Sequence, residues 1–415
     1  MVEHLNRKYV IFAAVLLIIL ISLSLFLTVN TSSKQTSTRP FYVGIEYGYG
    51  DQFSQLKALV DEVKSYTNLI IIGVLLSFNR SVLDESCDYI FNLGLYFIVF
   101  FTNPRLYNES EGWVNYNIFN WITNAQQKYG DQFLGIYVYD EPGGNQLDKG
   151  SSILINNTST FTYPDSPTGY AEVSDDYVGN LSTILGSYYS LTDYATKIIT
   201  ADYGLYWFDY EAGYSTILGE FVGNQSRQLT IALDRGAAQS FNEDWGVIIT
   251  WKYDQRPYLE SGSELYSDLS LAYTAGATYA VVFSYPDIST RAHATYGTVT
   301  QQQLNALQKF WNEIHTNPGS FAPSTPEEAY VIPEDYGFGF RGPSDTIWGL
   351  FPADSLSPKI WDDTQILLYG IVKQYEMPLQ YYYSSDLNII YDNLTVIAPT
   401  LKNYAKVFYW NQTIS

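Results

Sequence analysis

The sequence has few of the side chains that bind metals or form cross-links. Among its 415 residues there is one cysteine, Cys87, and there are three histidines, His4, His293 and His315. A single cysteine excludes an intramolecular disulfide and a zinc site built on thiolates. Three histidines are too few for a metal site built on imidazole. We therefore expect no cofactor. Any chemistry that the protein carries out should use carboxylates.

Charged residues are also scarce, and most of them are acidic. They make up 16% of the chain, and 22 Lys and Arg against 43 Asp and Glu give a net charge of −21. Such a surface repels phosphate backbones, so a nucleic-acid partner is not expected. The hydrophobic content of 46% excludes intrinsic disorder. The length allows one large domain, or a large domain with a small one.

One long apolar run lies near the N-terminus. Residues 9–29 carry no charged side chain, and at ~1.5 Å per residue a helix of this length spans a hydrocarbon core of ~30 Å. Arg7 and Lys8 precede the run, which places the N-terminus in the cytoplasm and the rest outside the cell. We expect a cytoplasmic stub and uncleaved signal anchor over 1–29 and a stalk over 30–40. The alternative is a cleaved signal peptide, whose apolar region is shorter.

Sequons for N-glycosylation support a location outside the cell. Together with the anchor they predict a single-pass protein of the cell membrane, with most of the chain extracellular. The lack of disulfides is typical of an archaeal surface protein rather than a secreted eukaryotic one. The sequons lie at Asn30, Asn79, Asn108, Asn156, Asn157, Asn180, Asn224, Asn393 and Asn411.

From residue 41 to residue 318, short apolar runs alternate with amphipathic helices. This regular alternation predicts a parallel sheet in an α/β fold, and eight units favour closure into a (β/α)8 TIM barrel over an open, doubly wound sheet. A polar stretch over 145–175 is expected to be an inserted loop. The apolar runs are 41–48, 69–78, 95–104, 133–144, 197–202, 215–222, 245–254 and 278–287, and the helices 53–66, 81–94, 114–130, 177–195, 226–241, 261–276 and 299–314.

A smaller unit follows the barrel. After residue 318 a linker rich in Pro and Ser leads to residues 328–415, where the pattern predicts one helix and a few strands. This length is too short for a complete open-sheet domain. We expect a reduced, flavodoxin-like α/β accessory unit that packs on the barrel. Its predicted strands are 328–337, 387–392 and 405–410, and its helix is 357–370.

Acidic residues follow several of the predicted strands, and the active site of such a barrel forms at the carboxyl ends of its strands. Because side chains alternate along a strand, Glu46 and Glu141 should point into the barrel mouth and Asp140 away from it. Glycoside hydrolysis needs two carboxyl groups, one protonated and one ionised. Glu141 is the candidate acid/base. Its partner is Glu220 by first choice and Asp254 by second.

Polar and aromatic side chains near these strand ends are candidates for substrate binding. The acidic and basic ones would bind hydroxyls or tune the carboxyl pair, and aromatic faces would pack against the apolar faces of sugar rings. The alternative is that the aromatic residues belong to the core and the acids are merely solvated. Arg227, at a helix start, is expected to form a salt bridge rather than bind an anion. The candidates are Glu46, Tyr139, Asp202, Trp207, Trp251, Lys252 and Tyr253.

With these residues the chain resembles the glycoside-hydrolase (β/α)8 superfamily, and its layout is similar to that of family 42 β-galactosidases. Such enzymes usually carry Asn-Glu after strand 4, where this chain has Asp140-Glu141, and a Glu at strand 7, where it has Asp254 or none. Other segments resemble archaeal membrane-anchored surface proteins of unassigned activity. These segments are YWFDYEAGY (206–214), GEF (219–221), SRQ (226–228), ITWKYDQRPYLESG (249–262) and DTIWGLFPADSLSPKIW (345–361).

The sequence therefore predicts an extracellular, membrane-anchored, glycoside hydrolase-like protein whose partner is a carbohydrate substrate or an envelope glycan. One rival is a non-catalytic glycan-binding or envelope structural protein on a degenerate barrel. Another is an envelope assembly subunit, which would expose large apolar patches on the helix layer. Two carboxyls close together in an open pocket favour the enzyme. Carboxylates that point apart, or a mouth plugged by 145–175, favour the binding protein.

Overall fold

The structure is a computed structural model that describes residues 40–101, 114, 116–150, 154–155, 169–192, 196–253, 258–284, 299–317, 324–370 and 387–414. Residues from Phe41 onward form one unit, which is separate from residues 1–40. Within the described ranges no helix combines the length and apolar character needed to cross a bilayer. The predicted anchor over 9–29 and most of the stalk lie outside those ranges.

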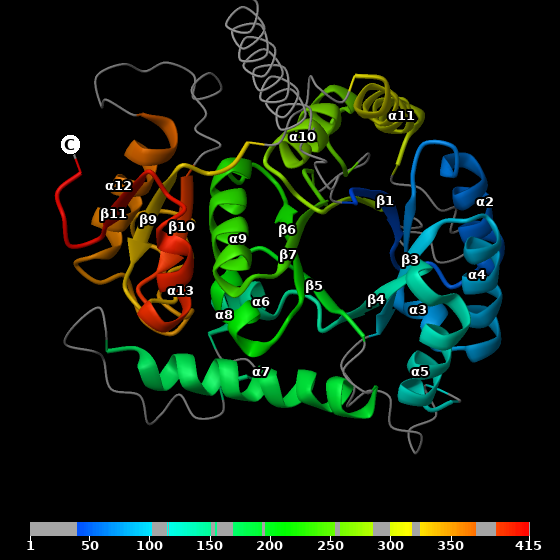
Figure 1. Cartoon of the computed structure of the whole chain (residues 1–415), viewed down its shortest axis with the longest axis horizontal. Coiled ribbons are helices and arrows are strands. Elements are labelled where there is room, and N and C mark those ends of the chain that lie inside the picture. Colours follow the sequence, from blue (N-terminus) through cyan, green and yellow to red (C-terminus); the bar gives the residue numbers. More distant parts are fainter. Residues whose placement is uncertain are drawn as a thin grey trace, which may run out of the picture. The chain divides into compact units, whose positions relative to one another are not determined.

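Eight parallel strands close into a barrel, which confirms the predicted closure (Figure 1). The strands follow one another around the barrel in sequence order. The last strand pairs with the first, from Tyr42 opposite Tyr279 to Tyr47 opposite Ser284. Closure leaves no unpaired strand edge. The strands are β1 (Tyr42–Tyr47), β2 (Leu69–Ile72), β3 (Tyr96–Phe101), β4 (Phe133–Val138), β5 (Ile198–Asp202), β6 (Thr216–Phe221), β7 (Asp244–Ile249) and β8 (Tyr279–Ser284).

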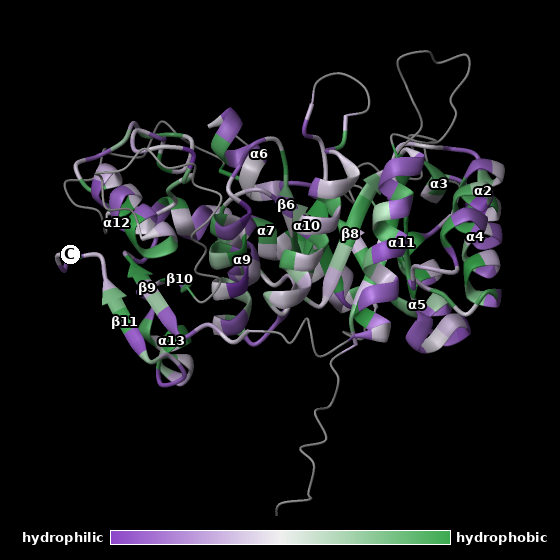
Figure 2. Cartoon of the chain, turned by 90° about the horizontal axis from the view of Figure 1, so that it is seen from above, coloured by the Kyte–Doolittle hydropathy of each residue, from purple (hydrophilic) through white to green (hydrophobic). Residues whose placement is uncertain are grey.

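Helices cover the outside of the barrel. Their apolar faces, such as Leu56 and Leu59, are buried in one cluster with the outward-facing strand residues Val43 and Ile45. In Figure 2 hydrophilic and hydrophobic residues alternate along the helices, as expected for helices that are buried on one face. The larger helices are α2 (Phe53–Val63), α4 (Arg80–Asn92), α5 (Ile118–Tyr129), α7 (Ala171–Leu191), α9 (Arg227–Phe241), α10 (Gly262–Thr274) and α11 (Gln301–Thr316).

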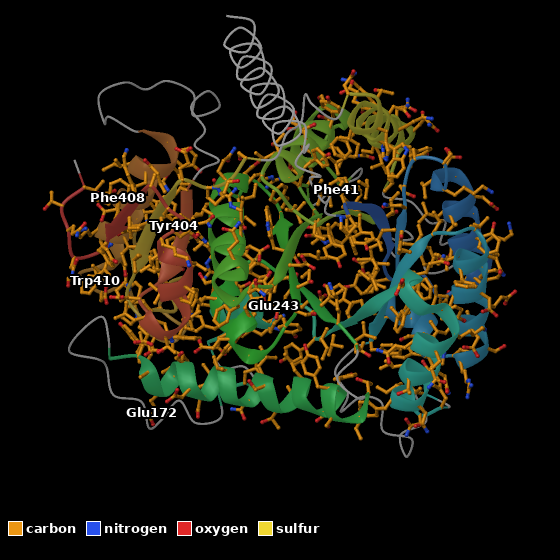
Figure 3. The ribbon with its side chains drawn as sticks, in the orientation of Figure 1. Phe41, Glu172, Glu243, Tyr404, Phe408 and Trp410 are labelled. Atoms are coloured by element: carbon orange, nitrogen blue, oxygen red, sulfur yellow. The ribbon has the colours of Figure 1, made fainter. Side chains whose placement is uncertain are left out.

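The barrel interior is a packed core. Inward-facing residues such as Ile71, Tyr137, Leu218 and Ile248 form one buried cluster, and side chains fill the space that the ribbon encloses (Figure 3). A ligand can therefore reach the barrel only at the ends of its strands. The carboxyl ends are the end at which such folds place their active sites.

Three segments differ from the predicted secondary structure. The run 69–78 leaves the sheet after Ile72 and continues as the short helix α3 (Val74–Ser77). The segment 203–214, for which neither a strand nor a helix is predicted, contains helix α8 (Tyr206–Ala212). The expected loop 145–175 is helical at both ends, because α6 (Pro142–Lys149) extends into it and α7 begins at Ala171. Pro142 occupies the first turn of α6, where its missing N–H costs no hydrogen bond.

The C-terminal part of the chain contains a second, small sheet. Three parallel strands pair in the order β10-β9-β11. An additional helix, α13, follows β10 and was not predicted. Kinship with flavodoxin-like folds stays a prediction. The elements are β9 (Glu328–Ile332), α12 (Ser357–Tyr369), β10 (Leu387–Tyr391), α13 (Leu394–Leu401) and β11 (Lys406–Tyr409).

Helix α9 lies between the barrel strands and this small sheet (Figure 1). The buried guanidinium of Arg235 in α9 donates hydrogen bonds to Asn388 Oδ1 at 2.8 Å and to the carbonyl of Leu387 at 3.0 Å. A Cβ atom at Gly236 would lie 2.4 Å from the carbonyl oxygen of Ile389, so this glycine allows α9 to approach β10 closely. The small sheet is thus joined to the barrel by buried polar contacts as well as by apolar packing.

Candidate active site

A small cavity lies at the carboxyl ends of the barrel strands. Its volume is about 50 Å³, which is room for about one or two water molecules at ~30 Å³ each. Residues from all eight barrel strands, or from the segments directly after them, form its wall. Four carboxyls and several aromatic rings dominate this wall, namely Glu46, Asp140, Glu141, Glu220, Tyr49, Phe100, Tyr137, Trp251 and Phe283. We refer to this cavity as the mouth.

Glu141 and Glu220 are hydrogen-bonded to each other through their side-chain carboxyls. Glu220 lies near the end of β6, on the inward face that it shares with Leu218, and is 5% exposed. Glu141 follows β4 and is the N-cap residue of α6. Two carboxyls can hydrogen-bond to each other only when one of them carries a proton. This hydrogen bond therefore requires one proton between the two carboxyls.

The surroundings of the pair decide which member keeps the proton. Burial raises the pKa of Glu220 well above its usual range, and the charges of Glu141 and Asp140 raise it further. Burial also raises the pKa of Glu141, but the hydrogen bond with Glu220 lowers it. Glu220 is 5% exposed and the more deeply buried of the two, so burial favours the proton on Glu220 rather than on Glu141.

Two more carboxyls line the mouth beside this pair. Burial, together with the charge of Glu141, raises the pKa of Asp140 to about 7, and the hydroxyl of Tyr137 donates a hydrogen bond to Asp140. Burial and then the charge of Asp140 raise the pKa of Glu46 well above its usual range. The described residues that line the mouth include no Lys, Arg or His. Negative charge here is therefore opposed by no cation in the wall.

The prediction that Asp140 points away from the mouth was wrong. Strand β4 ends at Val138, and the next residues, Tyr139 and Glu141, have positive φ angles of 58° and 52°. The backbone turns sharply there, so the alternation of an extended strand no longer applies. Asp140 consequently lines the same cavity as Glu141. The Pro142 that begins α6 was the available sign that the strand had already ended.

Asp202, a predicted substrate ligand, does not line the mouth. It is fully buried, and its carboxylate accepts hydrogen bonds from the backbone N–H groups of Gly143 at 2.6 Å and Gly144 at 2.8 Å. The N–H groups of Tyr203 and Gly204 donate to it as well. Burial raises its pKa to about 7 even though these bonds act to lower it. Asp202 thus holds the first turn of α6, directly after Glu141.

The aromatic residues that were predicted to bind substrate lie in different parts of the structure. Trp251 lines the mouth. Trp207 is 3% exposed and packs against Phe241 and Tyr391, with ring centroids 4.9 and 5.3 Å away, so it belongs to the core between α8, α9 and β10. Tyr139 is half-buried and Tyr253 is exposed, and neither is in the wall of the mouth. Phe100, Tyr137 and Phe283 line it instead and were not named as candidates.

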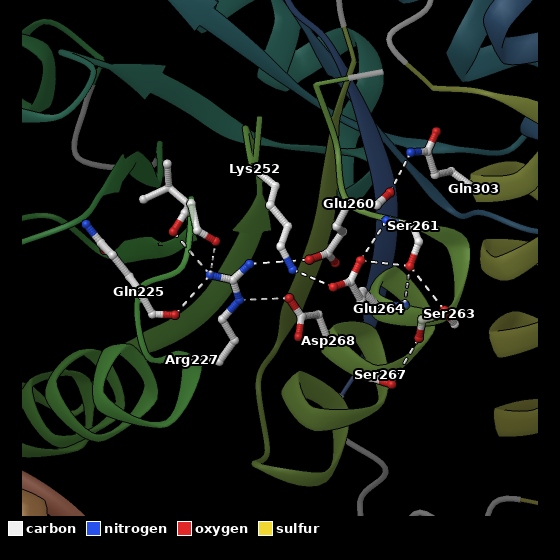
Figure 4. Close-up of polar contacts among 12 residues, drawn as sticks. Gln225, Arg227, Lys252, Glu260, Ser261, Ser263, Glu264, Ser267, Asp268 and Gln303 are labelled. Atoms are coloured by element: carbon white, nitrogen blue, oxygen red, sulfur yellow. Dashed lines mark hydrogen bonds and ion pairs between the residues drawn. The ribbon is translucent and has the colours of Figure 1, made fainter. Parts of the chain in front are cut away.

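Lys252 belongs to a network of ion pairs that Figure 4 shows and that we call the Arg227 network. Lys252 Nζ lies 2.6 Å from Glu264 Oε1. Arg227 pairs with Asp268 at 2.9 Å and with Glu260 at 3.3 Å, which confirms the expected salt bridge. The ammonium of Lys252 is therefore held by a carboxylate of α10 and does not line the mouth.

The remaining predicted residues are Asp254 and the sequons, and some of them lie outside the described part of the chain. Asp254 and the sequons Asn30, Asn108, Asn156 and Asn157 lie outside the described residues, so their roles stay predictions. The exposed sequons are Asn79, Asn224 and Asn411, and Asn393 is half-exposed. Asn180 is the least suited to carry a glycan, because its amide nitrogen donates to the carbonyls of Leu154 and Asp176.

The described surface does not favour an envelope assembly subunit. Large apolar side chains are exposed in five separate segments of the described chain, and only two of them lie within helices. The described helices therefore lack the run of exposed apolar side chains that such a subunit needs. Within the same ranges no group of His, Cys, Asp and Glu side chains could hold a metal ion. The exposed apolar residues are Tyr49, Leu93, Leu191, Tyr253 and Leu394.

Comparison with known proteins gives a likeness of structure only. No family model and no curated protein matches the sequence. GH5_18 from Bifidobacterium longum subsp. longum has a TM-score of 0.47 and 10% identity, covering 90% of this chain and 98% of that one. The β-1,4-D-mannanase from Cryptopygus antarcticus has a TM-score of 0.42 and 10% identity, covering 65% and 89%. The β-mannanase from the blue mussel Mytilus edulis has a TM-score of 0.41 and 10% identity, covering 68% of this chain and 94% of that one.

At these TM-scores and identities the likeness says nothing about what this chain does. The (β/α)8 barrel is established by the chain's own strand order and pairing. The similarity in layout to family 42 β-galactosidases and the likeness to archaeal surface proteins stay predictions.

Proposed function

We propose that this chain is a glycoside hydrolase whose reacting groups are Glu141 and Glu220. The observation that supports the proposal is the hydrogen bond between these two carboxyls at the carboxyl ends of the barrel strands, in a wall whose described residues include no cation. A protonated and an ionised carboxyl side by side are the two groups that cleavage of a glycosidic bond requires. The aromatic rings of Tyr49 and Trp251 in the same wall suit the apolar faces of a sugar.

The closeness of the two carboxyls favours retention of configuration. Inverting enzymes hold their carboxyls ~6.5–9.5 Å apart so that a water molecule fits between the base and the sugar, whereas retaining enzymes hold them ~5–5.5 Å apart. Carboxyls that hydrogen-bond directly leave no room for that water. A substrate that breaks this hydrogen bond would instead bring the anomeric carbon between the two groups.

The electrostatics favours a division of roles opposite to the one that the sequence suggested. Glu220 keeps the proton and is the proposed acid/base, and the ionised Glu141 is the proposed nucleophile. In the first step Glu220 gives its proton to the glycosidic oxygen, the bond from that oxygen to the anomeric carbon breaks, and Glu141 forms an ester with the sugar. In the second step Glu220 takes a proton from water, whose oxygen attacks the anomeric carbon and releases Glu141.

Covalent trapping tests this proposal and the roles together. The purified full-length chain is incubated with a panel of dinitrophenyl 2-deoxy-2-fluoro-glycosides, and the labelled peptide is identified by mass spectrometry. We expect a sugar ester on Glu141, absent from Glu141→Gln and present in Glu85→Gln, which alters an exposed carboxyl on α4. A label on Glu220 would reverse the roles. Hydrolysis of aryl glycosides that survives both Glu141→Gln and Glu220→Gln would end the proposal.

A non-catalytic glycan-binding protein is the second candidate, and the small volume of the mouth favours it. A cavity of about 50 Å³ lies well below the ~300–1,000 Å³ of ordinary ligand sites. This candidate predicts saccharide binding without release of reducing ends. Calorimetry and product analysis with the corresponding aryl glycosides that carry no fluorine separate the two candidates.

We also propose that the chain is displayed outside the cell and anchored by residues 9–29. The charges of Arg7 and Lys8 and the exposed sequons Asn79, Asn224 and Asn411 support this location. Protease treatment of intact cells should then digest the barrel. Protection of the barrel in intact cells, with digestion only after lysis, would contradict the proposed location.

A further inference from the structure

A second and larger cavity lies between the barrel and the small C-terminal sheet. Its volume is about 500 Å³, within the range of small-molecule binding sites and about ten times that of the mouth. One wall comes from the loop after β5 and from the starts of α8 and α9. The other comes from residues 338–341, from α12 and from the end of β10. We refer to it as the interface cavity.

Aromatic rings form much of the wall of the interface cavity. Tyr206, Phe338 and Tyr391 are buried in it, whereas Tyr203 and Trp361 are only half-buried and therefore keep ring surface for a ligand. Trp361 lies on α12 one turn before Gln365, so the indole ring and the amide project into the cavity together. A flat apolar face beside a polar group suits a ligand that has both characters.

The polar groups of this wall are mostly neutral. Gln225 and Gln365 bring amides, which both donate and accept hydrogen bonds. Arg341 is the one charged residue among the described residues of the wall. Its guanidinium is bound by Asp345, at 3.0 Å from Nε, and by Asp148. No positive charge is thus left over to attract an anion, and the chain as a whole carries −21.

We propose that the interface cavity binds a neutral oligosaccharide. The C–H faces of its rings would pack on Trp361 and Tyr203, and its hydroxyls would pair with the amides. The binding does not rest on catalysis at the mouth, because the described residues in the wall of the interface cavity include no carboxyl. The two cavities share the loop after β5, where Ala201 lines the mouth and Tyr203 lines the interface cavity. A long glycan bound here would therefore lie one loop away from Glu141.

Calorimetry on the full-length chain tests this site. The protein carries Glu141→Gln to prevent hydrolysis, and the probes are mannotetraose and cellotetraose, with trigalacturonate as an anionic comparison. We expect at least one neutral tetrasaccharide to bind, and trigalacturonate to bind at least tenfold more weakly. Trp361→Ala should weaken the binding at least tenfold and Gln365→Ala severalfold. Trp311→Ala, which alters a half-buried tryptophan of α11 outside both cavities, is the matched control and should leave the affinity unchanged, whereas Trp251→Ala in the mouth reports any binding there.

Three results would overturn the inference. They are the absence of binding by both tetrasaccharides at millimolar concentration, tighter binding of trigalacturonate, and weakening by Trp251→Ala instead of Trp361→Ala. If Trp361→Ala does not fold, Gln365→Ala decides, and an unchanged affinity then overturns the inference. Trp361-dependent binding in a chain that hydrolyses no glycoside would remove the proposed function alone. Hydrolysis without such binding would remove this inference alone.

Discussion

Two clusters of acidic side chains lie near the same end of the barrel, and they differ in whether cations accompany them. In the Arg227 network two cations face three carboxylates. The bond from Lys252 lowers the pKa of Glu264 to about 2, whereas burial raises that of Glu260 to about 8 against the charge of Arg227. In the mouth, four carboxyls meet within described walls that hold no cation, and the pKa of each is raised.

This difference separates a structural role from a chemical one. In the Arg227 network the cations hold the structure together, because the guanidinium of Arg227 joins the carbonyls of residues 222, 223 and 225 to α10. The bond from Lys252 keeps Glu264 ionised. Carboxyls without a cation keep protons near neutral pH and can give them away. The number of acidic residues at a strand end is therefore a poorer guide to an active site than the absence of a compensating charge.

The largest expected effect is on hydrolysis, and it sharpens the contrast between the clusters. Glu220→Gln should lower kcat/KM by about 10³-fold or more, because the loss of a general acid costs about 10²–10⁴-fold. Glu264→Gln, in the Arg227 network, should change kcat/KM only severalfold. The measurement is the rate of aryl-glycoside hydrolysis at fixed pH. Equal losses in the two variants would break the distinction.

The next effect is on the free energy of unfolding. Here the large effect is expected in the Arg227 network rather than in the mouth. Arg227→Met should lower the free energy of unfolding by about 3–5 kcal/mol, because it leaves Glu260 and Asp268 buried without their cation. Lys57→Met removes an exposed pair with Asp61 and should cost at most about 1 kcal/mol. Urea unfolding of both variants gives the two values. A loss below that of Lys57→Met would show that the network does not hold the fold.

A smaller effect is the dependence of stability on pH. Asp202 and Asp140 have folded-state pKa values of about 7, above the ~3.9 of an unfolded aspartate. The folded chain therefore binds more protons than the unfolded chain between about pH 4 and pH 7, and stability falls as the pH rises through that window. Glu264, with its lowered pKa, acts in the opposite direction below about pH 4.

Thermal unfolding followed from pH 3 to pH 8 should accordingly show the highest Tm at about pH 4–5. Asp202→Asn should flatten the fall in Tm between pH 4 and pH 7, although it lowers Tm itself by weakening the bonds to Gly143 and Gly144. A Tm that rises steadily toward pH 8 would contradict the raised pKa values of Asp140 and Asp202.

The sequence predicts the barrel and part of the mouth because both depend on local patterns. Alternation within a strand correctly turns Glu46 inward, and it gives no clear direction for Glu220, which shares its face with Leu218 and Thr216. It fails at Asp140, two residues beyond the strand, where Tyr139 and Glu141 have positive φ angles. No pattern marks that turn except the proline that follows it.

Pairing between distant segments could not be predicted. Arg227 meets Asp268 at a separation of 41 residues, and nothing local distinguishes that carboxylate from the other acidic residues. The same holds for the interface cavity, where the start of α9 meets the end of α12 through Ser226 and Tyr369, 143 residues apart. Such contacts depend on how helices and sheets from distant parts of the sequence pack against each other.

The shared proton of Glu141 and Glu220 can be observed without knowledge of any substrate. Carbon-13 NMR of the glutamate carboxyls, titrated in the unmodified chain and in each single Gln variant, reads their protonation directly. We predict one carboxyl, absent in Glu220→Gln, that titrates well above the ~4.3 of free glutamate, and a lower midpoint for it in Glu141→Gln. Two carboxyls that both titrate near the ordinary value would contradict a proton held between them.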